Sequence, residues 1–277
     1  MSMTIDMPPT VIHTTVDYYV PPAGQKEHGI GDDDFEEQYG NKNVVHYPIK
    51  LRDMRTGGFT LEKNGFQLVP YQSKLTAEDC LDLDTIKKVY FPELMAAIKK
   101  VTGASEVHII LPRFRDTSTE KSGFKKGWNY NNGPVRRSHI DISPSGIEET
   151  LIPILGEEYL KSIAGRWKFV NAWRPTRLVE RDPLAVCHKV PEEDLIALER
   201  TIPGKALKQG RYLVKAGDHE WYFAPNQQPD ELLLFTQYSD FPDRGLADRV
   251  VHASVMLPGT EDKPARTSIE ARVIVVW

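Results

Sequence analysis

Cysteine is scarce in this chain, with only Cys80 and Cys187 among 277 residues. Two cysteines are too few for the disulfide framework of a small secreted domain or for a cysteine-rich zinc site. Long apolar runs are also missing, since no stretch reaches the length of a membrane-spanning helix. The first residues, MSMTIDMPPTVIH, lack the basic start and apolar core of a signal peptide. These absences predict a cytoplasmic protein with no membrane partner.

Excess positive charge is absent as well. The chain carries 35 Lys and Arg against 39 Asp and Glu, which gives a formal net charge of −4. Proteins that bind nucleic acid generally present a basic surface, so we predict no nucleic-acid partner. At 277 residues the chain is long enough to bury a substantial core.

The composition of residues 20–43 differs from the rest, because this stretch is rich in Pro, Gly and acidic side chains. Such a stretch has no core of its own. We therefore expect a flexible N-terminal segment over residues 1–43 and a single domain over residues 44–277. Residues 115–138 are polar and rich in Lys and Arg, a pattern that favours a solvated loop over a lid.

Strand patterns dominate the chain. We predict helices at 92–103, at 145–163 and from Pro191, and a hairpin at 59–69 whose turn is Asn64-Gly65. Strands are predicted at 105–111 and 166–175, and then in the runs RYLVKA, EWYFAP, ELLLFTQY, DRVVHASVML and TSIEARVIVVW. Those runs follow one another with turn residues between them, as in a barrel or sandwich. The sequence thus predicts a mainly β domain with flanking helices.

A histidine and an aspartate stand two residues apart in VRRSHIDISP, residues 135–144. On a strand this spacing points His139 and Asp141 to the same face. The pair alone is weak evidence, because a polar strand edge gives the same pattern. His252, in a later strand, could complete a site of two histidines and one carboxylate, which leaves metal positions open and is typical of non-haem Fe(II) oxygenases.

The last predicted strand carries a candidate anion site. In ARTSIEARVIVVW, alternation places Arg266, Ser268 and Arg272 on one face. A guanidinium beside a hydroxyl can compensate the charge of a buried dicarboxylate. A solvated charged edge is the alternative, but the apolar ending VIVVW predicts a buried strand.

These motifs together resemble a known family. An Arg-x-Ser 14 residues after a distal histidine (266 − 252) resembles the cosubstrate clamp of Fe(II)/2-oxoglutarate-dependent oxygenases, whose core is a double-stranded β-helix (jelly roll, cupin-like). The spacing of Arg266 and Arg272 is similar to the two-arginine strand of the AlkB-type branch. A set of segments in this order resembles the hydroxylase/desaturase family of secondary metabolism, which includes the cephamycin methoxylation subunit and fungal gibberellin desaturases: SHIDIS, VNAWRP, PLAVCH, EWYFAP, DELLLFTQYSD and ARTSIEARVIVVW. His188 departs from the aspartate expected there.

The resemblance implies a chemistry and a set of roles. His139, Asp141 and His252 would hold Fe(II), and 2-oxoglutarate and O2 would be cosubstrates. Arg266, Ser268 and Arg272 would bind 2-oxoglutarate. The enzyme would hydroxylate, desaturate or cyclise a small biosynthetic substrate by C–H abstraction, releasing succinate and CO2. The pocket candidates are Asn171, Trp173, Arg174 and Tyr238, and plain packing is their alternative. A homodimer is compatible with the sequence.

Three other functions compete with this interpretation. The same three ligands could hold zinc for hydrolysis, but that leaves the Arg-x-Ser strand unexplained. An AlkB-like nucleic-acid demethylase fits poorly with the acidic balance of the chain. The chain could also be a non-catalytic partner subunit of a two-protein biosynthetic system, which would need no Fe(II) and no 2-oxoglutarate.

Overall fold

The protein was studied as a computed structural model, which describes residues 11–21, 43–116, 123–125, 128–130, 134–201, 208–241 and 246–277. The strands of these residues form two sheets. The spatial order of the eight-stranded sheet is β1 (Val11–Tyr19), β2 (Val44–Asp53), β12 (Glu220–Phe223), β9 (Leu184–His188), β14 (Val251–Ser254), β7 (His139–Ile140), β11 (Lys208–Val214) and β10 (Leu195–Thr201). The order of the seven-stranded sheet is β3 (Phe66–Pro70), β13 (Glu231–Ser239), β8 (Trp167–Pro175), β15 (Thr267–Val276), β4 (Glu106–Asp116), β6 (Trp128–Tyr130) and β5 (Gly123–Lys125).

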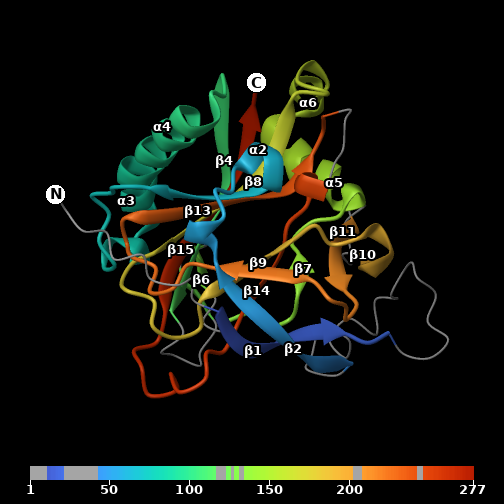
Figure 1. Cartoon of the computed structure of the whole chain (residues 1–277). Helices are drawn as coiled ribbons and strands as arrows, with labels where there is room; N and C mark the ends of the chain where they lie inside the picture. Colours follow the sequence, from blue (N-terminus) through green and yellow to red (C-terminus); the bar gives the residue numbers. More distant parts are fainter. Residues whose placement is uncertain are drawn as a thin grey trace.

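Helices cover the outside of this pair of sheets. The α-helices are α2 (Leu61–Asn64), α3 (Leu83–Thr85), α4 (Phe91–Thr102), α5 (Pro144–Leu155) and α6 (Glu157–Ser162). Shorter helical turns span Met54–Thr56, Asp79–Leu81, Ile86–Tyr90, Glu192–Asp194 and Leu246–Asp248. Figure 1 shows α3 and α4 at the upper left, beside β4 and β13, with α5 and α6 at the upper right. None of the described helices is both long and apolar enough to cross a lipid bilayer.

Alternation along the strands divides the side chains between an outer and an inner layer. On β8, Val170 and Ala172 point outward and pack with Leu94 and Ile98 of α4 in the largest apolar cluster. The intervening side chains of β8 point to the other face of the sheet. There Trp173 packs in a cluster that draws side chains from both sheets, among them Val186 of β9 and Phe235 of β13. The inner layer is therefore where the two sheets meet.

Several predicted elements are present. Helix α4 starts with a proline in its first turn and ends at Gly103, whose φ of 68° is the left-handed conformation that glycine adopts without strain. The helical stretch predicted at 145–163 is α5 followed by α6. The strands predicted at 105–111 and 166–175 are β4 and β8, and the five later runs are β11 to β15.

Two local predictions were wrong. The expected hairpin at 59–69 is instead helix α2 followed by β3, because the Thr60 side chain accepts a hydrogen bond from the amide of Lys63 and Gly65 (φ 81°) closes the helix. The helix expected from Pro191 is a single turn followed by strand β10. There Ile196 pairs opposite Leu213, and pairing with β11 overrides the local helix preference.

The N-terminal prediction also needs correction. Residues 11–19, which the sequence assigned to a flexible segment, form strand β1 and pair with β2 along their whole length. The side chains of Tyr18 and Tyr19 are buried, so this strand belongs to the folded sheet. Residues 1–10 and 22–42, which carry the rest of that prediction, lie outside the described residues, as does most of the predicted loop before residue 134.

Candidate metal centre and cosubstrate site

Three side chains of the eight-stranded sheet converge. His139 of β7 and His252 of β14 are register partners on neighbouring strands, and their ring centres lie 4.2 Å apart. Asp141 follows β7 directly. Its Oδ1 is 3.5 Å from His139 Nε2 and its Oδ2 is 3.8 Å from His252 Nε2. One ligand atom from each of the three residues lies within 4.8 Å of the others.

The seven-stranded sheet supplies the partners of Asp141. The amide of Asn171 on β8 donates to Oδ2 at 2.7 Å, and Arg272 Nη2 on β15 is 3.0 Å from Oδ1. Arg272 and Asn171 are register partners, so their side chains approach the carboxylate together. The Oε1 atom of Gln237, on β13 of the same sheet, accepts a hydrogen bond from the Asp141 backbone amide at 2.8 Å. The position of this carboxylate is thus fixed on several sides.

The electrostatics keep the three groups ready to bind a cation. Burial alone would raise the pKa of the Asp141 carboxyl, but the Arg272 guanidinium and the two imidazoles outweigh it and hold that pKa well below its usual range. Burial, followed by the neighbouring His139, lowers the pKa of His252 to about 3, so its imidazole is neutral near pH 7. His139 Nδ1 donates to the Arg137 carbonyl at 2.7 Å, so Nε2 is the ring nitrogen that remains for a metal ion.

This donor set fits Fe(II). Two imidazole nitrogens and one carboxylate on one side of an ion are the facial arrangement of non-haem Fe(II) oxygenases. Metal-binding histidines generally donate their second ring N–H to a carbonyl or carboxylate, and metal-binding carboxylates are hydrogen-bonded in turn. The Arg137 carbonyl and the Asn171 amide meet both expectations.

A second group of polar side chains lies at the start of β15. Arg266 is almost fully buried, donates through Nη1 to Ser254 Oγ at 3.0 Å, and lies with its guanidinium carbon 5.5 Å from the ring centre of Trp173. Ser254 is two residues after His252 on β14, so one strand serves both groups. The buried hydroxyl of Ser268 has no hydrogen-bond partner among the described residues. A buried, unpartnered hydroxyl beside a guanidinium suits a carboxylate ligand.

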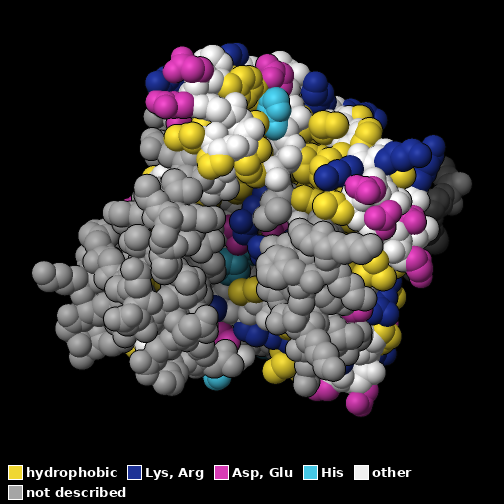
Figure 2. All heavy atoms as spheres, turned by 180° about the vertical axis from the view of Figure 1, so that it is seen from behind, with side chains coloured by type: hydrophobic (Ala, Val, Ile, Leu, Met, Phe, Trp, Pro, Cys, Tyr) yellow, Lys and Arg dark blue, Asp and Glu magenta, His cyan; other side chains and the backbone are white. Residues whose placement is uncertain are grey.

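Further arginines lie on the inner face of β4, and together with the inward side chains of β8 and β15 they form what we call the inner wall. Arg115 lies opposite Ser268 and Arg113 opposite Glu270 in the register of β4 with β15. Burial, with the charge of Arg272 next in importance, lowers the pKa of Arg113 to about 10. In the space-filling view of Figure 2, basic, acidic and histidine side chains lie close together near the middle of the face shown. The wall carries more cations than anions, which favours an anionic ligand.

Comparison with known proteins identifies the family. A family model described as "Oxidoreductase/YMDC permease-like domain" matches residues 16–276. The alpha-ketoglutarate-dependent dioxygenase phiK of a fungal species is 45% identical over 281 residues, which covers 100% of this chain and 100% of the relative. The hydroxylase/desaturase efuI of Hormonema carpetanum is 33% identical over 99% of this chain and 98% of the relative. The chain belongs to the Fe(II)/2-oxoglutarate-dependent dioxygenases. The hydroxylase/desaturase resemblance found in the sequence is thereby confirmed.

The fold prediction is confirmed as well. The iron and alpha-ketoglutarate-dependent endoperoxidase NvfI, in a form described as having a different conformation, matches with a TM-score of 0.78 at 23% sequence identity. The match covers 97% of this chain and 98% of that chain. The mainly β architecture of this dioxygenase is thus the jelly roll of its family, which requires Fe(II) as cofactor and 2-oxoglutarate and O2 as cosubstrates.

The four pocket candidates divide into two pairs. Asn171 and Trp173 lie on the inner face of β8, where they contact Asp141 and Arg266 respectively. Arg174 does not belong with them, because neighbouring strand residues face opposite ways. Its guanidinium donates to the carbonyls of Pro229 and Leu75.

Tyr238 also packs elsewhere. Its ring centre lies 5.4 Å from that of Trp167 and its hydroxyl donates to Asp240. It belongs to the apolar cluster beside α5 and α6 rather than to the inner wall.

Several residues that lie around the candidate site were not found from the sequence. Arg113 and Arg115 had a usable signal, since PRFRD repeats the alternation seen on β15 at the end of an apolar strand. Gln237 is displaced to its position by a register shift in β13, between Thr236 and Tyr238, which no local pattern predicts. Asp182, in the loop before β9, gave no pattern at all.

Proposed function

We propose that His139, Asp141 and His252 hold the Fe(II) of this dioxygenase. The observation that carries the proposal is the convergence of two imidazoles and one carboxylate from two adjacent strands and the residue that follows one of them. Asn171 and Arg272 would keep the carboxylate in place through its two oxygens. Arg272 would therefore act on the metal ligand rather than directly on the cosubstrate.

We further propose that Arg266 and Ser268 bind the distal carboxylate of 2-oxoglutarate. The support is a buried guanidinium, a buried hydroxyl without a partner among the described residues, and a surrounding excess of arginine. Trp173 and Ser254 would orient the guanidinium. Bound Fe(II), with 2-oxoglutarate and O2, supplies an oxidant for a substrate C–H bond as succinate and CO2 are formed.

The substrate that we propose is a small biosynthetic intermediate of secondary metabolism, which the enzyme hydroxylates, desaturates or cyclises. The support comes from relatives named hydroxylase/desaturase and from a relative named gibberellin cluster GA4 desaturase, which is 30% identical over 85% of this chain. The absence of a nucleic-acid or membrane partner, the cytoplasmic location and the homodimer stay predictions of the sequence.

A metal titration tests the ligands. We expect anaerobic Fe(II) followed by 2-oxoglutarate to produce the weak visible charge-transfer band of the chelate. The variants His139→Ala and His252→Ala should lose Fe(II) binding, whereas His13→Ala, which removes an exposed histidine of β1, should behave as the wild type. Full Fe(II) affinity in His252→Ala would disprove the ligand set.

A second titration tests the clamp. Arg266→Ala should retain Fe(II) and bind 2-oxoglutarate about 10- to 100-fold more weakly, since hydrogen bonds to charged groups contribute about 1.5–3 kcal/mol. Arg174→Gln is the matched control, because that arginine is equally buried but lies on the outer face of the same sheet. Unchanged affinity for 2-oxoglutarate in Arg266→Ala would reassign the clamp to another arginine of the inner wall.

A further inference from the structure

Asp182 occupies an unusual position behind the proposed clamp. It lies in the loop between β8 and β9 and is almost fully buried. Its φ of 57° is in the left-handed region, which residues other than glycine seldom adopt, although Asp and Asn tolerate it. Buried residues in this conformation persist when several surrounding contacts fix them.

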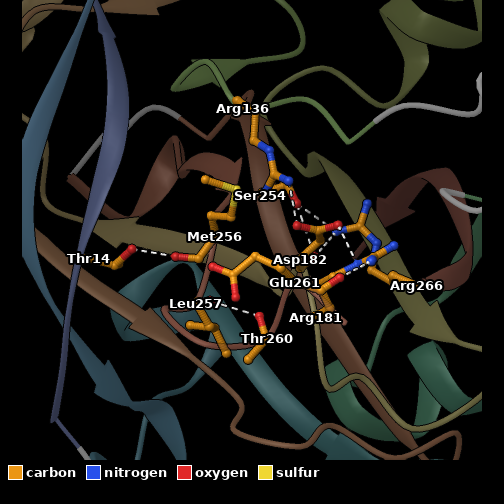
Figure 3. Close-up of polar contacts among 10 residues, drawn as sticks. All are labelled: Thr14, Arg136, Arg181, Asp182, Ser254, Met256, Leu257, Thr260, Glu261 and Arg266. Atoms are coloured by element: carbon orange, nitrogen blue, oxygen red, sulfur yellow. Dashed lines mark hydrogen bonds and ion pairs between the residues drawn. The ribbon is translucent and has the colours of Figure 1, made fainter. Parts of the chain in front are cut away.

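Those contacts come from three arginines, as Figure 3 shows. Asp182 Oδ1 forms a short ion pair with Arg136 Nη2, and Oδ2 lies 3.5 Å from Arg181 Nε. The main-chain carbonyl of Asp182 accepts hydrogen bonds from Arg266 Nη1 and from Ser254 Oγ, the latter at 3.0 Å. One residue thus contacts three guanidiniums and the strand that carries His252.

The charges around Asp182 do not balance. The guanidiniums of Arg136 and Arg181 contact the one carboxylate of Asp182, and that of Arg266 contacts its carbonyl. After burial itself, the charge of Arg115 lowers the pKa of Arg266, while the charges of Asp182 and Glu270 raise it. The buried Nη1 of Arg136 has no hydrogen-bond partner among the described residues. A group of cations with an unused buried donor is most stable when an anion joins it.

We propose that Asp182 is a positioning residue for 2-oxoglutarate binding, because its carbonyl orients Arg266 while its carboxylate holds Arg136 beside it. This inference rests on the clamp proposed above. Arg136 lies three residues before His139, so the same ion pair also connects the clamp to the segment that leads into the metal ligands. With the carboxylate removed, the repulsion among the guanidiniums is no longer offset, and Arg266 loses its preferred orientation.

The test is Asp182→Asn, which suits the left-handed backbone and keeps the carbonyl but removes the charge. With Mn(II) as a redox-inert metal, we expect about tenfold weaker binding of 2-oxoglutarate, because the ion pair that holds Arg136 beside Arg266 is lost. The affinity for Mn(II) itself should not change. Glu180→Gln is the matched control, since it removes a carboxylate from the same loop, where Glu180 makes an exposed ion pair with Lys263 at 3.5 Å. Wild-type 2-oxoglutarate affinity in Asp182→Asn would overturn the proposal.

A double mutant separates positioning from general support of the fold. If Asp182 acts through Arg266, then Asp182→Asn should weaken binding no further in an Arg266→Ala background. An equal loss in both backgrounds would mean that Asp182 supports only the fold, and would overturn the inference. Should Asp182→Asn fail to fold, Arg136→Gln, on a half-buried side chain, is expected to show the same selective loss. Normal 2-oxoglutarate binding by Arg266→Ala alone would instead refute the clamp, so the two failures are distinguishable.

Discussion

Replacing Arg272 with methionine should make the stability of this fold depend on bound metal. In the metal-free protein the Asp141 carboxylate is buried, and among the described residues Arg272, with Nη2 3.0 Å from Oδ1, is the arginine or lysine that contacts it. The remaining neighbours are the amide of Asn171 and two imidazoles, of which His252 is neutral. Methionine keeps much of the side-chain volume but leaves the carboxylate without a cation.

The magnitude follows from the burial of the pair. Breaking a buried ion pair by removing one partner costs about 3–5 kcal/mol, because the other charge stays buried. For a chain somewhat longer than 250 residues, 1 kcal/mol shifts the melting temperature by about 2–4 °C, so the metal-free variant should melt about 6–20 °C lower. A divalent ion held by His139, Asp141 and His252 would replace the missing positive charge. Saturating metal should therefore raise the melting temperature more in the variant than in the wild type.

The assay is a thermal melt in excess chelator and again with saturating Mn(II). Arg174→Met is the control, because Arg174 is a buried arginine of the same sheet whose guanidinium contacts carbonyl groups on the outer face. Its metal-dependent shift should equal that of the wild type. The reasoning is refuted if Arg272→Met loses the same number of degrees with and without Mn(II).

Three further predictions concern single contacts of the site. Asn171→Ala removes the amide that holds Asp141 and should weaken Mn(II) binding by about 10- to 100-fold in a calorimetric titration; unchanged affinity would make that contact irrelevant. Burial lowers the pKa of His252 to about 3 in the metal-free fold. Between about pH 6.5 and pH 3 this histidine therefore binds a proton in the unfolded chain but not in the fold, so the free energy of unfolding falls as the pH falls, by at most about 1.4 kcal/mol per pH unit. When urea unfolding is measured at several pH values, the free energy of unfolding of His252→Gln should fall less per pH unit than that of the wild type. An equal fall in both proteins would contradict this. Ser268→Ala should bind 2-oxoglutarate about tenfold more weakly with no loss of melting temperature, since its hydroxyl has no partner in the described fold; a lower melting temperature would contradict this.

The predictability of each element depended on whether its pattern was local. Helix α4 has its own start and stop residues, and β8 and β15 have strong alternation, so these elements could be found from sequence. Strand β10 could not, because the residues that follow Pro191 favour a helix in isolation and become a strand only by pairing with β11. Strand β1 was missed for the same reason, since its neighbour β2 begins 25 residues after β1 ends (44 − 19).

Strand parity explains which site residues could be predicted. The rule that places His139 and Asp141 on one face also groups Asn171 with Trp173, and it separates both from Arg174, the third pocket candidate of the VNAWRP segment. Parity says which way a side chain points but not which strand lies opposite. The pairing of Arg272 with Asn171, and hence their joint contact with Asp141, therefore needed the structure.

The two sheets contribute different chemistry to the site. The candidate metal ligands come from the eight-stranded sheet, while the groups that set the charge of Asp141 come from the seven-stranded sheet. The main-chain carbonyl of Asp182 accepts hydrogen bonds both from Arg266, which precedes β15, and from Ser254 of the ligand-bearing β14. Because each half is incomplete alone, the geometry of the site depends on how closely the sheets pack. The apolar cluster around Trp173, Val186 and Phe235 spans both sheets and therefore holds the two halves of the site together.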